Sequence, residues 1–90
     1  MNVTFCKGSR GSPCTDILHV EDITVSTSAV SSSGAPDEAT MVRIYSVDAL
    51  RVIIGTTPVP TAASGLYFPA DSIEYYHIDP GEKVGAILSS

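Results

Sequence analysis

The sequence predicts an all-β protein, and three observations lead to this fold class. Four segments, 41–48, 50–55, 73–79 and 83–88, are rich in β-branched and aromatic residues, which favour strands. Glycine and proline interrupt the chain between several of these segments. No segment places apolar residues at convincing helical spacing. We therefore expect about six to eight strands in a small antiparallel β-sandwich or jelly-roll-like barrel with an extended N-terminal arm.

The length of the chain, 90 residues, is that of one domain. We expect an N-terminal arm or loop over 1–16 and a β-sandwich over 17–90. A chain this short buries only a little more than half of its unfolded surface, so its stability is modest unless a disulfide, a metal or oligomerisation adds to it. Charged residues make up 17% of the chain, and serine and threonine take their place. Such a surface favours contact with other proteins.

The first sixteen residues contain Gly8, Gly11 and Pro13 and show no helical periodicity. A short strand over 2–6 is possible, and the rest has the composition of a loop or an extended arm. An arm usually becomes ordered against a partner, and Phe5 would then be its apolar anchor. A frayed terminus is the alternative.

The two cysteines, Cys6 and Cys14, are eight positions apart. A disulfide between them would close a small loop and add about 2–3 kcal/mol of stability. Two free thiols are the alternative, because a reducing cytosol does not maintain such a bond, although it can form after release.

The segment 17–30 begins with a brief apolar run over 17–20, which opens a strand or fills the edge of the core. Over 21–30, apolar and hydroxyl side chains alternate, with Ile23, Val25 and Ala29 on one face. A period of two predicts a strand with one dry and one wet face. The loop that follows, 31–39, is broken by glycine and proline.

The segments 41–48 and 50–55 are predicted to form a hairpin around the tight connection Asp48-Ala49. Val42 and Ile44 share one face of the first strand, and the opposite face carries Met41, Tyr45 and Val47. Both faces are therefore largely apolar. In an antiparallel sheet this pattern indicates that other layers or partners cover both sides.

The segment 56–72 contains too many breakers for a helix or a central strand, and we expect a long arch between two sheets in a Greek-key arrangement. Within it, Leu66 and Phe68 are expected to be buried and Tyr67 to be the contact residue. The strands 73–79 and 83–88 are joined through Pro80-Gly81, the residues that a type II turn prefers.

Charge and hydropathy exclude several partners. The formal net charge is −5, and the five basic residues are scattered, so no nucleic-acid partner is expected. No run of about 18 apolar residues exists, so we expect no membrane partner. The N-terminus lacks the features of a signal peptide, so we expect the chain to be made and kept in the cytosol unless it leaves in a larger assembly.

Candidate catalytic and metal-binding residues are few. The histidines, His19 and His77, accompany no Gly-x-Ser-x-Gly motif and no recognisable cysteine signature, so packed or exposed histidines are the better interpretation. Cys6 and Cys14 could join them at zinc, but no close cysteine pair or histidine pair is present. The acidic residues mostly lie in predicted turns, without a calcium loop. We expect no enzyme, no cofactor and no bound metal.

The C-terminal half resembles small virion proteins of tailed bacteriophages, the capsid-associated kind that decorate or cement the shell. The resemblance covers about half of the chain and is a pattern of strands and turns. The segments that carry it come in this order: 42–44, 52–55, 58–62, 68–70, 73–76 and 79–84.

The resemblance implies a structural virion protein that binds the major capsid protein on the outer surface of a phage shell and stabilises it. Such a protein needs no cofactor, is made in the host cytoplasm and is expected to form a small homo-oligomer. Phe5, Arg10 and Tyr67 are the candidate capsid or subunit contacts. One alternative is another virion role, in a tail, fibre or adaptor. A second is a carbohydrate-binding β-sandwich that stacks sugars on Tyr67, Tyr75 and Tyr76, although the absence of tryptophan argues against it.

Overall fold

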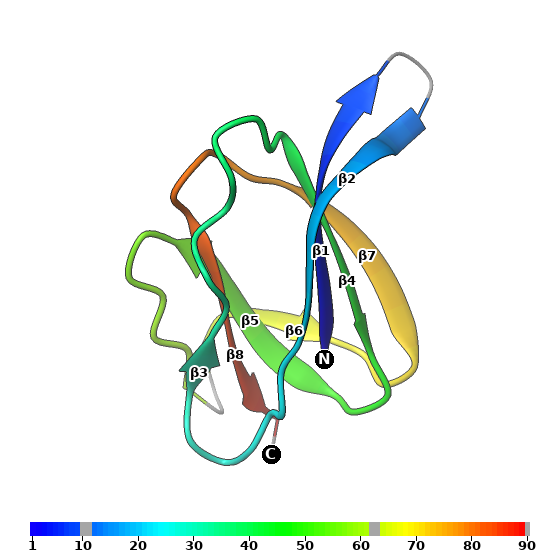
Figure 1. Cartoon of the computed structure of the whole chain (residues 1–90). Coiled ribbons are helices and arrows are strands. Elements are labelled where there is room, and N and C mark those ends of the chain that lie inside the picture. The colour runs from blue at the N-terminus through cyan, green and yellow to red at the C-terminus, as the bar shows by residue number, and fades with distance from the viewer. Residues whose placement is uncertain (10–11, 62–63, 90) are drawn as a thin grey trace.

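The computed structural model describes residues 1–9, 12–61 and 64–89, which form two four-stranded antiparallel sheets (Figure 1). The predicted all-β class is confirmed. The described strands are β1 (Asn2–Ser9), β2 (Ser12–Asp22), β3 (Val30–Ser31), β4 (Met41–Ser46), β5 (Leu50–Gly55), β6 (Leu66–Phe68), β7 (Ser72–His77) and β8 (Lys83–Leu88). The described part of the chain contains no helix long and apolar enough to cross a membrane.

The chain passes several times from one sheet to the other. Sheet A has the strand order β2-β1-β4-β7, and sheet B has the order β3-β8-β5-β6. Among the described strands, β1–β2 and β5–β6 are the consecutive pairs that hydrogen-bond within one sheet. The other connections pass from one sheet to the other, which places the inner faces of both sheets against a shared core.

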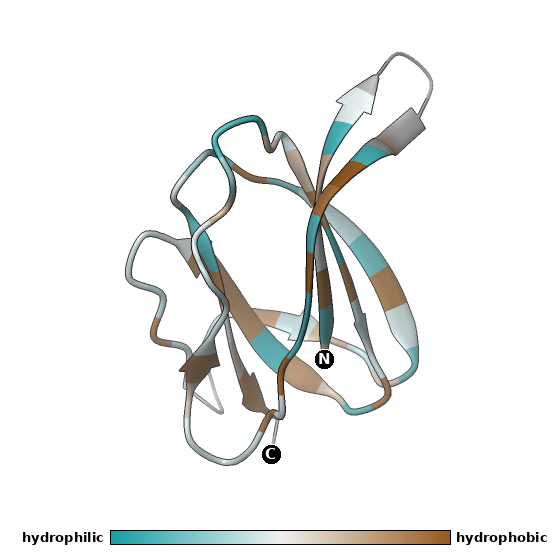
Figure 2. Cartoon of the chain, in the orientation of Figure 1, coloured by the Kyte–Doolittle hydropathy of each residue, from teal (hydrophilic) through white to brown (hydrophobic). Residues whose placement is uncertain are grey.

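The core follows the period of two that the sequence shows. Val42 and Ile44 of β4 are fully buried, whereas Met41, Arg43 and Tyr45 between them are only partly buried. β7 departs from this pattern: by its register with β4, Glu74 lies on the inner side and Ile73 and Tyr75 lie on the outer side, and bands of different hydropathy follow one another along the strand (Figure 2). The buried core cluster consists of Val3, Phe5, Ala35, Ala39, Val42, Ile44, Leu50, Val52, Phe68, Ile78, Val84 and Ala86.

The predicted hairpin between 41–48 and 50–55 is wrong, although both strands exist. β4 pairs with β1 and β7 in sheet A, and β5 pairs with β6 and β8 in sheet B. The connection, 47–49, therefore arches across the core. The buried Ser46 fixes its start, because its Oγ accepts a hydrogen bond from the backbone N–H of Asp48 at 3.1 Å and donates one to the carbonyl of Asp48 at 2.9 Å.

The predicted N-terminal arm is not confirmed, and the short strand considered over 2–6 lies within β1. β1 is an inner strand of sheet A, paired on one side with β2 and on the other with β4. β2 runs through the boundary expected between 16 and 17. β1 pairs with β4 only as far as Cys6, so beyond that residue β1 and β2 continue as a two-stranded ribbon that projects from the body (Figure 1).

Cys6 and Cys14 form a disulfide at the base of this ribbon, with Cα atoms 5.3 Å apart. Of the two states considered from the sequence, the bonded one is therefore present. The turn at Pro80-Gly81 is confirmed as well: Gly81 has φ +84°, and Glu82 N–H donates to the carbonyl of Asp79 at 3.1 Å. The strands that it joins lie in different sheets.

Two further expectations are corrected. Residues 23–29 do not form a strand; they are an extended crossing from sheet A to sheet B, in which Ile23 and Val25 pack against the core while Thr24 and Ser26 are exposed. The alternation therefore indicated which side chains are buried, although the segment is not a strand. The expected long arch, 56–72, includes the short strand β6, and only 69–71 cross between the sheets. Phe68 is buried as predicted, whereas Leu66 is 54% exposed.

Candidate functional site

The outer face of sheet A is the candidate functional surface, and we call it the open face. Residues directly opposite each other in an antiparallel sheet point to the same side, so the strand register defines its members. From β2 to β7 its rows are Asp22, Asn2, Tyr45 and Ile73; then Val20, Thr4, Arg43 and Tyr75; then Ile17, Cys6, Met41 and His77.

The open face carries exposed apolar side chains at both of its edges. Ile17, Val20, Ile73 and Tyr75 are 66%, 50%, 49% and 44% exposed. They lie on the two edge strands and flank a centre of shorter or partly buried side chains. Exposed apolar side chains that gather on one face are typical of a contact with another macromolecule.

The outer face of sheet B is different, because the chain itself covers it at β8. Gly85 and Ile87 point away from the core, opposite in direction to Val84 and Ala86, yet all four are buried. Residues 56–61, which we call the covering segment, lie over this face: a Cβ atom on Gly85 would come within 2.8 Å of the Cβ of Pro58. The apolar outer face of β8 is thus covered by another segment of the same chain.

The three candidate contacts from the sequence have different outcomes. Phe5 is fully buried on the inner side of β1, so it is not available as a surface anchor. Arg10 lies outside the described residues. Tyr67 is 53% exposed on β6, where the Arg51 guanidinium carbon lies 5.1 Å from its ring centroid in a cation–π contact.

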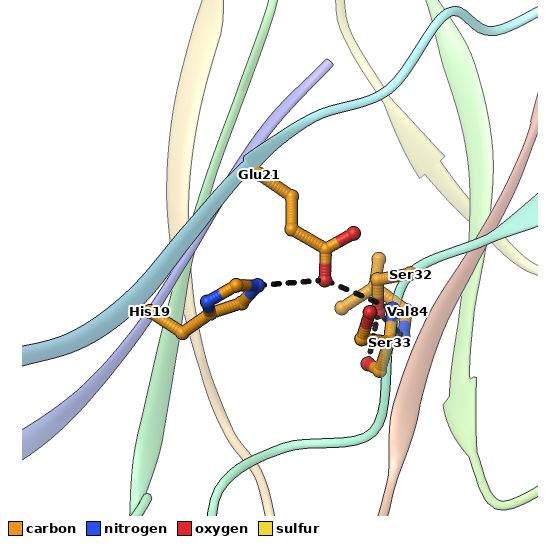
Figure 3. A network of polar contacts seen from close by, with 5 residues as sticks. All are labelled: His19, Glu21, Ser32, Ser33 and Val84. Atoms are coloured by element: carbon orange, nitrogen blue, oxygen red, sulfur yellow. Dashed lines mark hydrogen bonds and ion pairs between the residues drawn. The ribbon is translucent and has the colours of Figure 1, made fainter.

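His19 belongs to a polar network on the inner side of β2 (Figure 3). Its Nε2 lies 3.3 Å from Glu21 Oε1, and the same oxygen accepts a hydrogen bond from the backbone N–H of Ser33 at 2.9 Å. The neighbouring Ser32 Oγ accepts from Val84 N–H and donates to the carbonyl of Ser33, both at 2.9 Å. The network therefore joins an edge strand of sheet A to the segment after β3.

The proposed zinc ligands are not brought together. Cys6 and Cys14 are bonded to each other in the disulfide. The two histidines lie on β2 and β7, the opposite edge strands of sheet A. His77 Nε2 lies 3.2 Å from Asp79 Oδ1, where both side chains are exposed. Within the described ranges, no cluster of three or more histidine, cysteine or acidic residues has the arrangement of a metal site.

The tyrosines do not form one stacking platform. Tyr67 lies on sheet B, whereas Tyr75 and Tyr76 lie on sheet A and alternate between the two sides of β7. Tyr76 packs against the core, and burial, together with the negative charge of Glu74, raises its pKa above the usual value of 10.0.

Ile17, Val20 and Ile73 of the open face were not predicted from the sequence as contact residues, and Tyr75 was considered only for stacking on sugars. The signal for them was present, since each occupies the outward position of an alternating strand. What was missing was the strand order, which brings β2 and β7 onto one sheet. No pocket is formed by the residues that the structure describes. No family model, curated protein or solved structure matches the chain.

Proposed function

We propose that the protein is a capsid decoration, or cement, protein that binds the outer surface of a phage shell through the open face of sheet A. The observation that carries the proposal is the difference between the two sheets. Sheet B is covered by its own chain at Pro58, whereas the apolar side chains of sheet A remain exposed. The resemblance of the C-terminal half to capsid-associated phage proteins supplies the class of partner, the major capsid protein.

The open face suits this role physically. Burying apolar surface contributes about 25 cal/mol per Å², so Ile17, Val20, Ile73 and Tyr75 would supply much of the binding free energy. An added interface must be broken before the shell opens, and binding therefore stabilises the closed shell. Repetition on a symmetric lattice multiplies modest contacts through avidity when copies are linked as a homo-oligomer.

The proposal is tested by mixing the purified protein with capsids that lack it, from the phage that encodes the chain, and sedimenting the particles. We expect the protein to sediment with the capsids and to saturate at a fixed number of copies per shell. Electron microscopy of the saturated particles should then place density at repeated positions on the shell. Protein that stays in the supernatant, or density confined to a tail or fibre, would contradict a cement role.

A further inference from the structure

The four edge strands of the two sheets differ in how well they are protected. An unpaired edge invites pairing with another chain unless it is short, bulged or charged. β3 and β6 have two and three residues. β2 is long, but its register with β1 shifts twice, and it carries Asp16, Glu21 and Asp22. These three edges are therefore blunted.

β7 has none of this protection apart from one charge. Its six residues, Ser72–His77, contain no proline, glycine, lysine or arginine, and Glu74 is the one acidic residue among them. All six keep an unbroken register with β4, so the strand is regular from end to end. Its other edge pairs with no described strand and lies at the rim of sheet A (Figure 1). Ile73 and Tyr75 are 49% and 44% exposed beside this edge.

We propose that β7 pairs with β7 of a second copy of this chain, antiparallel and about a two-fold axis, so that the two A sheets become one continuous sheet. A two-fold axis perpendicular to the sheet makes a strand antiparallel to its own copy and keeps the open faces on the same side. Backbone hydrogen bonds along the shared edge supply the contact, as in other pairings by strand addition.

One register is favoured by charge and by the length of strand that is paired. With Tyr75 opposite Tyr75 of the second copy, Ile73 faces His77 and Glu74 faces Tyr76, whose hydroxyl can donate to the carboxylate. A register centred on Glu74 would place two carboxylates directly opposite each other, which is destabilising. A register centred on Tyr76 would extend beyond the end of the strand at His77.

A second copy fits the edge better than a foreign strand because the same residues recur across the axis. Tyr75 of one copy meets Tyr75 of the other on the open face, Ile73 faces His77, and each Glu74 gains a neutral donor. The dimer also makes the open faces of the two copies continuous. The inference goes beyond the proposed function and does not depend on it, since it concerns the chain alone.

The test uses sedimentation of the full chain without any capsid, over about 1–100 µM, a range that brackets micromolar affinity. We expect the mass of a dimer at the upper end. Tyr75→Lys, which places like charges at the axis, should raise the dissociation constant about tenfold or more while leaving the circular dichroism spectrum unchanged.

Cysteine substitution reads the register directly. Tyr75→Cys should give a disulfide-linked dimer after mild oxidation, because opposite Cβ atoms lie about 4.5–5.5 Å apart. Mass spectrometry would assign the bond and confirm that Cys6–Cys14 is intact. Glu74→Cys and the exposed Val47→Cys are the matched controls and should stay unlinked. A monomer at every concentration, or a dimer linked through position 74 and not through position 75, would overturn the proposal.

Discussion

Gly85 allows the covering segment to lie directly on sheet B. A Cβ atom at this position would come within 2.8 Å of Pro58 Cβ and 2.9 Å of the Pro58 carbonyl oxygen. Two atoms that close must move apart, and the proline ring and backbone have little freedom to do so. Because glycine has no side chain, Pro58 can lie directly over position 85 and cover this part of sheet B.

We therefore predict that Gly85→Ala lowers the free energy of unfolding by about 1–3 kcal/mol, as overpacking in other proteins does. Gly55→Ala is the matched control on the neighbouring strand, since no atom lies within 4 Å of its added Cβ. That change should be neutral or stabilise the fold by about 0.5–1 kcal/mol. Urea unfolding of both variants measures the difference, and equal effects at the two positions would refute the close contact.

The raised pKa of Tyr76 predicts that the stability of the protein depends on pH in the alkaline range. Its pKa is raised in the folded state by burial and by Glu74, so below the unfolded value of 10.0 the phenol is protonated in both states and its contribution is complete. As the pH rises above that value, the unfolded chain loses the proton first, and the free energy of unfolding falls. Tyr76→Phe cannot ionise and should show a shallower decline. Urea unfolding between about pH 8 and pH 11 measures it, and identical slopes for the two proteins would contradict the assignment.

At the scale of elements, a disulfide links the two strands of the β1–β2 ribbon. Cys6 belongs to the part of β1 that pairs with β4, whereas Lys7 and Ser9 pair only with β2. The disulfide to Cys14 therefore joins the ribbon to the sheet where the support of β4 ends.

Reduction of this bond should lower the free energy of unfolding by about 2–3 kcal/mol, the loop-closure value for a separation of eight residues. Urea unfolding with and without dithiothreitol measures the loss. Cys14→Ala should be less stable by a similar amount and insensitive to the reductant. A wild-type protein whose midpoint does not respond to reduction would show that the bond adds nothing to stability.

Much of the element pattern, but not the pairing, could be predicted from the sequence. The bounds 50–55 are those of β5, and 41–48 exceeds β4 by two residues. Alternation identifies the dry face of a strand, yet it does not say which strand lies beside it. A connection of three residues, 47–49, serves a hairpin or an arch equally well, and the choice of an arch depends on β1 and β7, which are distant in the sequence.

The N-terminal strand shows the same limit. Phe5 and Val3 alternate with polar residues as in any strand, but the glycines and proline after them have the composition of a loop. Burial of Phe5 depends on pairing with β4, some 37 positions later, which no local pattern contains. For the open face, the sequence supplied the two-sided apolar pattern of β4. The sequence did not predict that Pro58 covers β8 in sheet B or that the apolar side chains at the edges of sheet A are exposed.

At the scale of the whole molecule, Pro58 covers the outer face of β8 in sheet B, whereas the apolar side chains at the edges of the open face are exposed. This asymmetry leaves the open face accessible, with β7 at its free edge. A dimer through β7 would enlarge that face without covering it, so association and capsid binding are compatible.

The most direct test of the open face compares two exposed valines, one on each side of the molecule. Val20 lies on the open face and is 50% exposed, and Val59 lies in the covering segment and is 71% exposed. Lysine at either position should leave the fold intact, but at a buried contact it must be desolvated. In sedimentation with capsids, the account predicts that Val20→Lys weakens binding about tenfold or more and that Val59→Lys binds like the wild type. Undiminished binding of Val20→Lys, or a loss confined to Val59→Lys, would contradict it.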